Sequence, residues 1–162
     1  MAQASPELIA SIVRLKMEEL LGTEMFQDVS EDLCGACAIC SVALCKSLKR
    51  FGYKADLVHG MYQGYACHCW VELDGKIYDM TATQFGIIEK VFITDIDDFD
   101  YLEKDYISNI DSFFKQWVRT QKPYKYRIDK LFVDEKDLAA YQLISEAQFS
   151  KYKEVREAVL NL

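Results

Sequence analysis

The stretch HCWVELDGKIYD, at positions 68–79, decides the fold of this chain. The Asp-Gly pair at 74–75 separates the segments CHCWVEL and KIYDM, and such a pair favours a two-residue hairpin turn. In that register Trp70 faces Asp79 across two antiparallel strands. His68 and Asp79 are then diagonal neighbours on one face, whereas a slip of one residue would separate them. The sequence therefore predicts a hairpin that brings a histidine to an aspartate.

A helix with a cysteine in its first turn is predicted before the hairpin. Gly35 interrupts the chain, apolar residues then recur at helical spacing, and Gly52 ends the run. Cys37 falls where unsatisfied backbone N–H groups would stabilise a thiolate. The same apolar stripe is typical of a buried helix, so its position alone favours Cys37 as a core residue. Thiol chemistry is predicted by the combination with His68 and Asp79.

The segment from Gly35 to Asp79 resembles the transglutaminase-like superfamily of papain-type cysteine enzymes. A glycine stands two residues before the cysteine, and an apolar strand ends in glycine at LVHG, positions 57–60. HCWVE at 68–72 is similar to the family motif HAWVE, and YDMTATQF at 78–85 is similar to its aspartate element. The resemblance covers roughly the middle third of the chain.

The resemblance implies a fold and three roles. The fold is α+β, a transglutaminase-like or papain-like core in which a catalytic helix near the N-terminus packs on an antiparallel sheet, with a C-terminal helix added. Cys37 would be the nucleophile, His68 the general base and acid, and Asp79 the residue that orients His68. Trp70 is expected to line the substrate pocket beside Cys37, because it shares a sheet face with His68.

Departures from the family pattern limit what the resemblance implies. Lys54 and Met80 stand where the family often has proline, so a substrate preference does not transfer. Gln27 is the nearby upstream candidate for an oxyanion donor, together with the backbone N–H of Cys37. Cys34 would be the nucleophile instead if the alignment at Gly35 were misplaced.

Periodicity predicts further elements around this core. Helices are expected at 6–21 and 111–120, and strands near 55–62, 66–73, 76–82, 90–96 and 125–133. Residues 137–160 also have helical character and are expected to fold over the sheet or to mediate self-association. The acidic stretch at 95–105 lacks the glycine and terminal glutamate of an EF-hand, and is expected to be a solvated connection.

Composition bounds the class of protein. The chain has 162 residues, 51% of them hydrophobic, which predicts one domain over 1–162 with its core motif region at 33–96. Apolar runs are too short for a membrane span and charges interrupt the N-terminus, so a cytoplasmic protein without membrane association is expected. The net charge of −7 argues against nucleic-acid binding, and the basic, aromatic stretch at 122–130 is expected to be an edge strand.

The cysteines allow a second interpretation. Cys34, Cys37 and Cys40 form a CxxCxxC run of the kind that holds zinc or iron–sulfur clusters. On one helix, however, such residues form a stripe rather than surrounding an ion, so no metal or other cofactor is expected. His59 has no carboxylate at hairpin spacing and is the weaker candidate base.

Three functional classes follow. The favoured one is a thiol-dependent enzyme that forms an acyl-thioester on a protein or peptide, as a cysteine peptidase or deamidase if water is the acceptor. An amine acceptor would make it a cross-linking protein-glutamine acyltransferase. The other classes are a catalytically silent binding module of the same fold, and a metal or redox protein.

Overall fold

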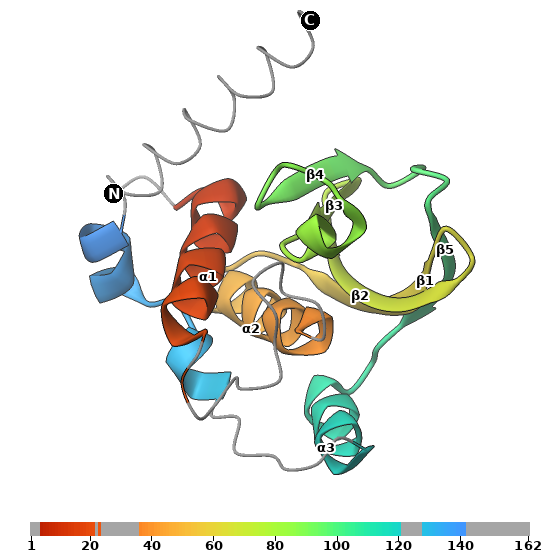
Figure 1. Ribbon diagram of the computed structural model, residues 1–162. Coiled ribbons are helices and arrows are strands. Elements are labelled where there is room, and N and C mark those ends of the chain that lie inside the picture. Colours follow the sequence, from red (N-terminus) through yellow and green to blue (C-terminus); the bar gives the residue numbers. More distant parts are fainter. Residues whose placement is uncertain (1–3, 22, 24–35, 121–127, 142–162) are drawn as a thin grey trace, which may run out of the picture.

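The computed structural model describes residues 4–21, 23, 36–120 and 128–141. Two helices precede the sheet: α1 (Pro6–Leu20) and α2 (Cys37–Arg50). The sheet contains β1 (Asp56–Tyr62), β2 (Ala66–Leu73), β3 (Lys76–Asp79), β4 (Phe92–Asp95) and β5 (Tyr101–Tyr106). The remaining elements are the 3₁₀ helices η2 (Ala82–Phe85) and η3 (Ile128–Leu131), and the helix α3 (Ile110–Thr120). This arrangement, shown in Figure 1, confirms the predicted α+β class.

The sheet is antiparallel throughout, in the order β4-β3-β2-β1-β5. Leu73 lies opposite Lys76 and Val71 opposite Tyr78, which is the predicted register of the β2–β3 hairpin. The turn residues at 74–75 have φ angles of 50° and 74°, the left-handed values that a two-residue turn of this kind requires. The local pattern around the Asp-Gly pair was therefore sufficient to set the register.

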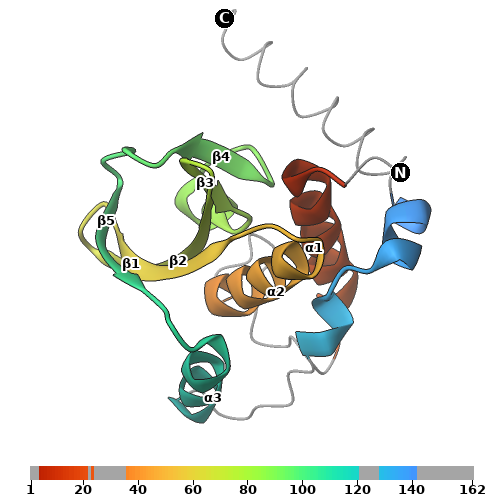
Figure 2. The same cartoon turned by 180° about the vertical axis from the view of Figure 1, so that it is seen from behind.

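The sheet curls strongly, and Figures 1 and 2 show α2 on the outer side of the curve with α1 beside it. Alternate residues of each strand consequently enter two different cores. Val71 and Leu73 of β2 pack with α1 and α2 in the larger, outer core. Trp70 belongs to an inner core inside the curve, with the other members Val58, Tyr62, Ile77 and Tyr101. Both faces of β2 are therefore covered, and a side chain on either face can be buried.

The predicted strand at 125–133 is wrong. Residues 128–131 form η3, and Leu131 and Val133 are buried in the outer core. The backbone N–H of Val133 donates to Ser47 Oγ of α2 at 3.0 Å, so this segment covers the helices instead of extending the sheet.

The fifth strand instead lies in the acidic stretch that was expected to be a connection. β5 pairs with β1 at the edge of the sheet, and Glu103 and Asp105 remain exposed there. The third strand is also shorter than predicted, because η2 follows it from Ala82. Residues 135–141 are helical, and the rest of the predicted C-terminal helix lies outside the described residues.

Gly60 is the position in β1 where a side chain is least tolerable. A Cβ atom there would lie 2.5 Å from the Leu102 carbonyl oxygen and 2.6 Å from the Trp70 ring. We expect Gly60→Ala to lower the free energy of unfolding by about 2–3 kcal/mol, because β5 and the inner core would both have to shift. Denaturant unfolding measures this change.

Gly86 provides the control for that substitution. It ends η2 with a φ of 86°, and a Cβ atom added there would have open space around it. Asparagine tolerates this backbone conformation, so Gly86→Asn should change the free energy of unfolding by less than about 1 kcal/mol. Equal losses for the two variants would show that crowding at Gly60 is not the cause.

Candidate active site

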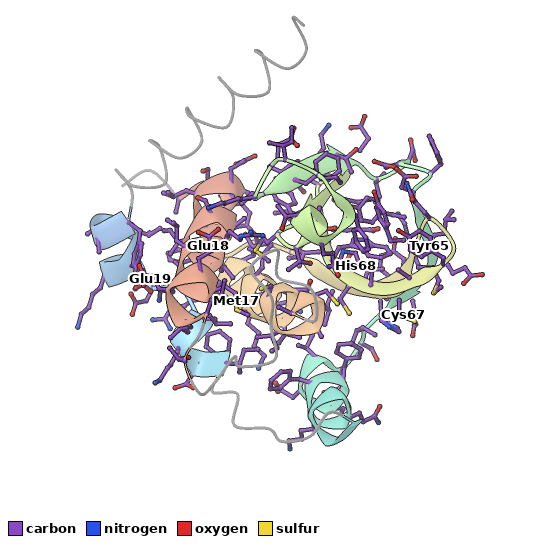
Figure 3. All side chains as sticks on the ribbon, in the orientation of Figure 1. Met17, Glu18, Glu19, Tyr65, Cys67 and His68 are labelled. Atoms are coloured by element: carbon purple, nitrogen blue, oxygen red, sulfur yellow. The ribbon has the colours of Figure 1, made fainter. Side chains whose placement is uncertain are left out.

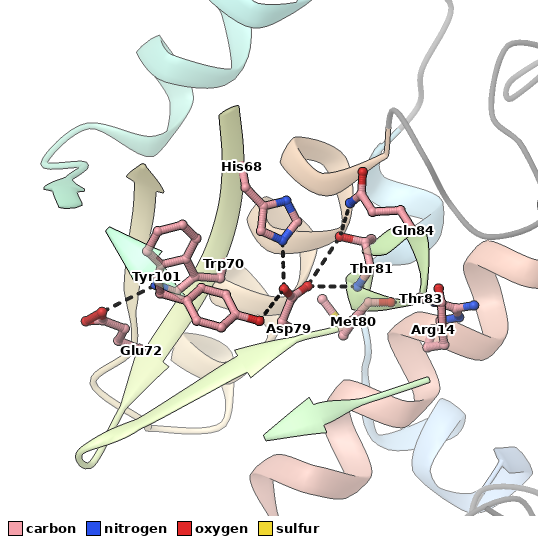
Figure 4. A network of polar contacts seen from close by, with 10 residues as sticks. All are labelled: Arg14, His68, Trp70, Glu72, Asp79, Met80, Thr81, Thr83, Gln84 and Tyr101. Carbon is pink, nitrogen blue, oxygen red and sulfur yellow. Dashed lines mark hydrogen bonds and ion pairs between the residues drawn. The ribbon is translucent and has the colours of Figure 1, made fainter. Parts of the chain in front are cut away.

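His68 and Asp79 form a buried ion pair at the ends of β2 and β3. His68 Nε2 donates to Asp79 Oδ2 at 2.7 Å, and each residue is only 1% exposed (Figure 4). The hairpin register accounts for this contact, because it makes the two residues diagonal neighbours on the inner face.

Asp79 receives further hydrogen bonds that hold it ionised. The backbone N–H of Thr81 donates to Oδ1 at 3.0 Å, and the Tyr101 hydroxyl donates to Oδ2 at 2.8 Å. Burial favours the neutral acid, but the charge and hydrogen bond of His68, with the donors on Thr81 and Tyr101, lower the pKa of Asp79 below its usual value. The carboxylate is therefore fixed in charge and in orientation.

An arginine from α1 anchors the segment that follows Asp79. Arg14 is buried, and its guanidinium donates to the Met80 carbonyl oxygen at 2.6 Å and to Thr83 Oγ1 at 3.0 Å. Glu18 accepts from the same guanidinium at 3.0 Å and balances its charge. Helix α1 thus holds the chain immediately after the aspartate, as Figure 4 shows.

Cys37 is the first residue of α2 and is partly exposed. Ala36 precedes it as the N-cap and makes no side-chain hydrogen bond to the helix. The N–H groups of the first turn point toward this N-terminal end, where Cys37 lies. The pKa of Cys37 is well below the usual thiol value. The neighbouring Cys69 side chain is the largest cause, and the nearby charge of His68 adds to it against the effect of burial.

His68 has the complementary shift. Burial disfavours its charged form, but the charge and hydrogen bond of Asp79, followed by the effect of nearby Cys37, raise the pKa of His68 to about 10. Its Nδ1 atom is buried without a hydrogen-bond partner among the residues that the structure describes. Since Nε2 is engaged by Asp79, Nδ1 is the ring nitrogen that stays available. The directions of the two shifts correspond to a thiolate beside an imidazolium.

Aromatic rings surround the imidazole. Phe85 of η2 meets the His68 ring edge-on at 4.9 Å and stacks on Tyr62 at 3.9 Å. Trp70 lies 6.0 Å from His68, on the sheet face predicted for it. Its side chain is fully buried, however, and its Nε1 donates to Glu72 Oε1 at 3.3 Å. Trp70 therefore packs behind the histidine and lacks the exposed face that the expected substrate contact needs, whereas Phe85 is partly exposed.

Four residues of the site were not predicted: Cys69, Thr81, Phe85 and Tyr101. The first three lie inside the motif stretches, where their nearness to Cys37, Asp79 or His68 in the chain was an available signal. Tyr101 had no local signal, because it comes from the unpredicted strand β5. Cys34, Gly35 and Gln27 lie outside the described residues.

The described cysteines of the CxxCxxC run, Cys37 and Cys40, do not form part of a metal site. Cys40 is fully buried in the outer core, and burial, the largest cause, raises the pKa of its thiol to about 12. Within residues 4–21, 23, 36–120 and 128–141, no group of three or more His, Cys, Asp or Glu side chains is arranged to hold a metal ion.

Comparison with protein-family models matches residues 23–89 to the transglutaminase-like superfamily. The match includes the start of α2, the β2–β3 hairpin and η2, and so includes Cys37, His68 and Asp79. Residues 23–89 are a transglutaminase-like segment. Comparisons with curated proteins and with solved structures found no match. The transglutaminase-like segment ends before β4, so Tyr101, which donates to Asp79, lies beyond it. None of the described helices is long and apolar enough to cross a membrane.

Proposed function

We propose that this protein is a thiol-dependent enzyme that cleaves amide bonds of proteins or peptides through an acyl-thioester on Cys37. The observation that carries the proposal is the His68–Asp79 pair at 2.7 Å on the sheet, together with Cys37 at the start of α2, the helix that packs against β2. Its residues have pKa shifts of the sign that this chemistry needs, with Cys37 lowered and His68 raised.

Acylation follows from these positions. The Cys37 thiolate attacks the substrate carbonyl carbon, and the resulting oxyanion is stabilised by backbone N–H groups at the start of α2. His68 gives its Nδ1 proton to the leaving nitrogen, so the C–N bond breaks and a thioester remains. Asp79 keeps the imidazole oriented and stabilises its charged form throughout.

Deacylation decides the class of enzyme. Water attacks the thioester with His68 as the base, which regenerates the thiol and releases an acid; the enzyme is then a peptidase or a deamidase. An amine in place of water gives a new amide, the reaction of a cross-linking acyltransferase. We propose hydrolysis. Mass spectrometry of peptide products, with and without a primary amine in excess, separates the two, since incorporation of the amine in preference to water contradicts hydrolysis.

A pH series tests the proposed chemistry. As pH falls through the lowered pKa of Cys37, the thiolate is protonated and alkylation by iodoacetamide should slow; through neutral pH the rate should stay on a plateau. As pH rises through about 10, His68 loses the proton that the leaving group needs, so cleavage should fall while alkylation persists. The cleavage rate plotted against pH should therefore be bell-shaped. Its two apparent pKa values describe Cys37 and His68 together, because the two groups titrate as a coupled pair.

Two other cysteines are internal references for the labelling. Burial, the largest cause, raises the pKa of Cys40 to about 12 and that of Cys45 to about 11, so both should be alkylated slowly at neutral pH. If Cys37 became reactive only above about pH 8, as an ordinary thiol does, the protein would be a binding module that retains the fold.

We also propose that the protein is located in the cytoplasm. Cys37, Cys40, Cys45, Cys67 and Cys69 are all free, which suits a reducing compartment such as the cytoplasm. Self-association through the C-terminal region stays a prediction, because residues 142–162 lie outside the described residues.

A further inference from the structure

The peptide group between Met80 and Thr81 connects Arg14 to Asp79. Its carbonyl oxygen accepts a hydrogen bond from Arg14 Nη1 at 2.6 Å, and its N–H donates to Asp79 Oδ1 at 3.0 Å. Arg14 is only 3% exposed, and both residues of the peptide group are buried. A charged donor therefore binds one side of a buried peptide group, and the carboxylate that pairs with His68 binds the other side, as Figure 4 shows.

The geometry of a peptide group makes this connection stiff. The group is planar and almost always trans, so its C=O and N–H point to opposite sides, and fixing the oxygen also fixes the direction of the N–H. The bond from a guanidinium to a carbonyl is charge-assisted, and hydrogen bonds in a chain polarise one another in the protein interior. Arg14 consequently aligns the Thr81 N–H with Asp79 and strengthens it as a donor.

Two further residues hold the Arg14 side chain in this position. Nη1 also donates to Thr83 Oγ1, and Nε donates to Glu18 Oε1, both at 3.0 Å. Lys90 Nζ lies 2.7 Å from the same Glu18 oxygen. Figure 3 shows Glu18 on α1 and His68 inside the curve of the sheet. Since Glu18 keeps the cation of Lys90, replacing Arg14 does not leave this carboxylate without a charged partner.

We propose that Arg14 is a positioning residue for the proposed amide chemistry. Acting through the peptide group, it holds Asp79 in the orientation that His68 needs. The inference rests on the proposed function, because it assigns Arg14 a role in that same reaction. Arg14 belongs to α1, which ends before the transglutaminase-like segment begins at residue 23. The contact is therefore supplied by a part of the chain that the family match does not include.

Lys16 makes the same kind of connection from α1 to a different part of the protein. Its Nζ donates to the Phe132 carbonyl oxygen at 2.8 Å, and the N–H of the same peptide group, that of Val133, donates to Ser47 Oγ at 3.0 Å. Lys16→Met thus removes a cation that binds a backbone carbonyl, but its peptide group leads to α2 instead of the aspartate. It is the matched control for Arg14→Met.

Peptide turnover and amide hydrogen exchange, followed by NMR, test the inference on the full chain. In Arg14→Met we expect kcat to fall about 10- to 100-fold and KM to change by less than about 2-fold, because orientation of the catalytic pair is lost and substrate binding is not. Protection of the Thr81 N–H from exchange should fall on the order of 10-fold relative to the other amides. In Lys16→Met we expect lower protection of the Val133 N–H, with unchanged kcat and unchanged protection at Thr81.

Arg14→Lys keeps the inference testable if Arg14→Met does not fold. Lysine retains the cation and a donor for the carbonyl oxygen but lacks the fork that also reaches Glu18, so kcat and Thr81 protection should each fall by less than about 3-fold.

A fall in kcat with unchanged protection of the Thr81 N–H, in either folded Arg14 variant, would overturn the inference. So would an unchanged kcat in Arg14→Met, or equal losses of kcat in Arg14→Met and Lys16→Met. The proposed function would survive each of these results. It would fail, and this inference with it, if the unsubstituted protein formed no acyl-enzyme.

Discussion

Cys37→Ala is expected to abolish the acyl-enzyme and to lower turnover by on the order of 10⁴-fold or more, because the nucleophile has no substitute at the start of α2. Cys69 is a neighbouring thiol, but it is buried and its pKa is strongly raised, mainly by the side chain of Cys37. Intact-protein mass spectrometry with an amide peptide library measures the covalent adduct, and product formation measures turnover.

Two further cysteine variants make that result specific. Cys67→Ala removes an exposed thiol from the same strand and should leave the adduct in place. Cys34→Ala tests the alternative alignment and should also retain the adduct. If Cys34→Ala loses the adduct and Cys37→Ala keeps it, the nucleophile is Cys34 and the family alignment at Gly35 is displaced.

Asp79→Asn should lower turnover by about 10²- to 10⁴-fold without reaching the Cys37→Ala floor. The amide keeps the shape of the side chain but removes the charge that contributes most to raising the pKa of His68, while burial of the imidazole still lowers it. The alkaline limb of the pH profile should therefore move from near 10 toward neutral pH. His68→Ala should cost nearly as much as Cys37→Ala, since no other histidine contacts Asp79 in the described part of the chain.

Tyr101→Phe is the matched control for the carboxylate. It removes one donor to Asp79 Oδ2 but keeps the ring that packs on Trp70 at 4.9 Å. Since His68 and Thr81 still bond to Asp79, turnover should fall by less than about 10-fold. A loss equal to that of Asp79→Asn, with no shift of the alkaline limb in Asp79→Asn, would contradict the orienting role of Asp79.

The Asp79–His68 pair also predicts how stability depends on pH. The folded pKa of His68 is raised, so its contribution to stability is complete below its unfolded value near 6.5 and is lost as pH rises through about 10. The folded pKa of Asp79 is lowered, so its contribution is present above its unfolded value and is lost as pH falls through the folded one. Both residues therefore contribute fully to folding stability only in mildly acidic solution, above the pH range in which Asp79 is protonated and below the range in which His68 loses its proton.

Local sequence predicted the parts of the site that local geometry builds. The Asp-Gly turn fixes the β2–β3 register, and the register alone places His68 beside Asp79. Gly35 and Gly52 delimited the helix that begins at Cys37. These features depend on hydrogen bonds and spacings within a few residues, which a single sequence displays directly.

Longer-range pairing produced the errors. β5 carries charged residues that read as a solvated connection, and it becomes a strand only by pairing with β1 through an irregular register near Gly60. Trp70 was assigned to the correct face, but its burial depends on Tyr101, which comes from β5. Neither pairing nor burial of this kind is visible in local periodicity.

The position of Tyr101 beyond the transglutaminase-like segment has a consequence for how the protein folds. The hairpin that joins His68 to Asp79 closes over a short loop, whereas the Tyr101 donor arrives only when a strand distant in the chain docks on β1. Contacts of greater sequence separation form later, because more chain entropy must be lost before they are made. The carboxylate thus gains its last protein donor after the hairpin has formed, and recovery of enzymatic activity during refolding should lag behind recovery of the hairpin signal.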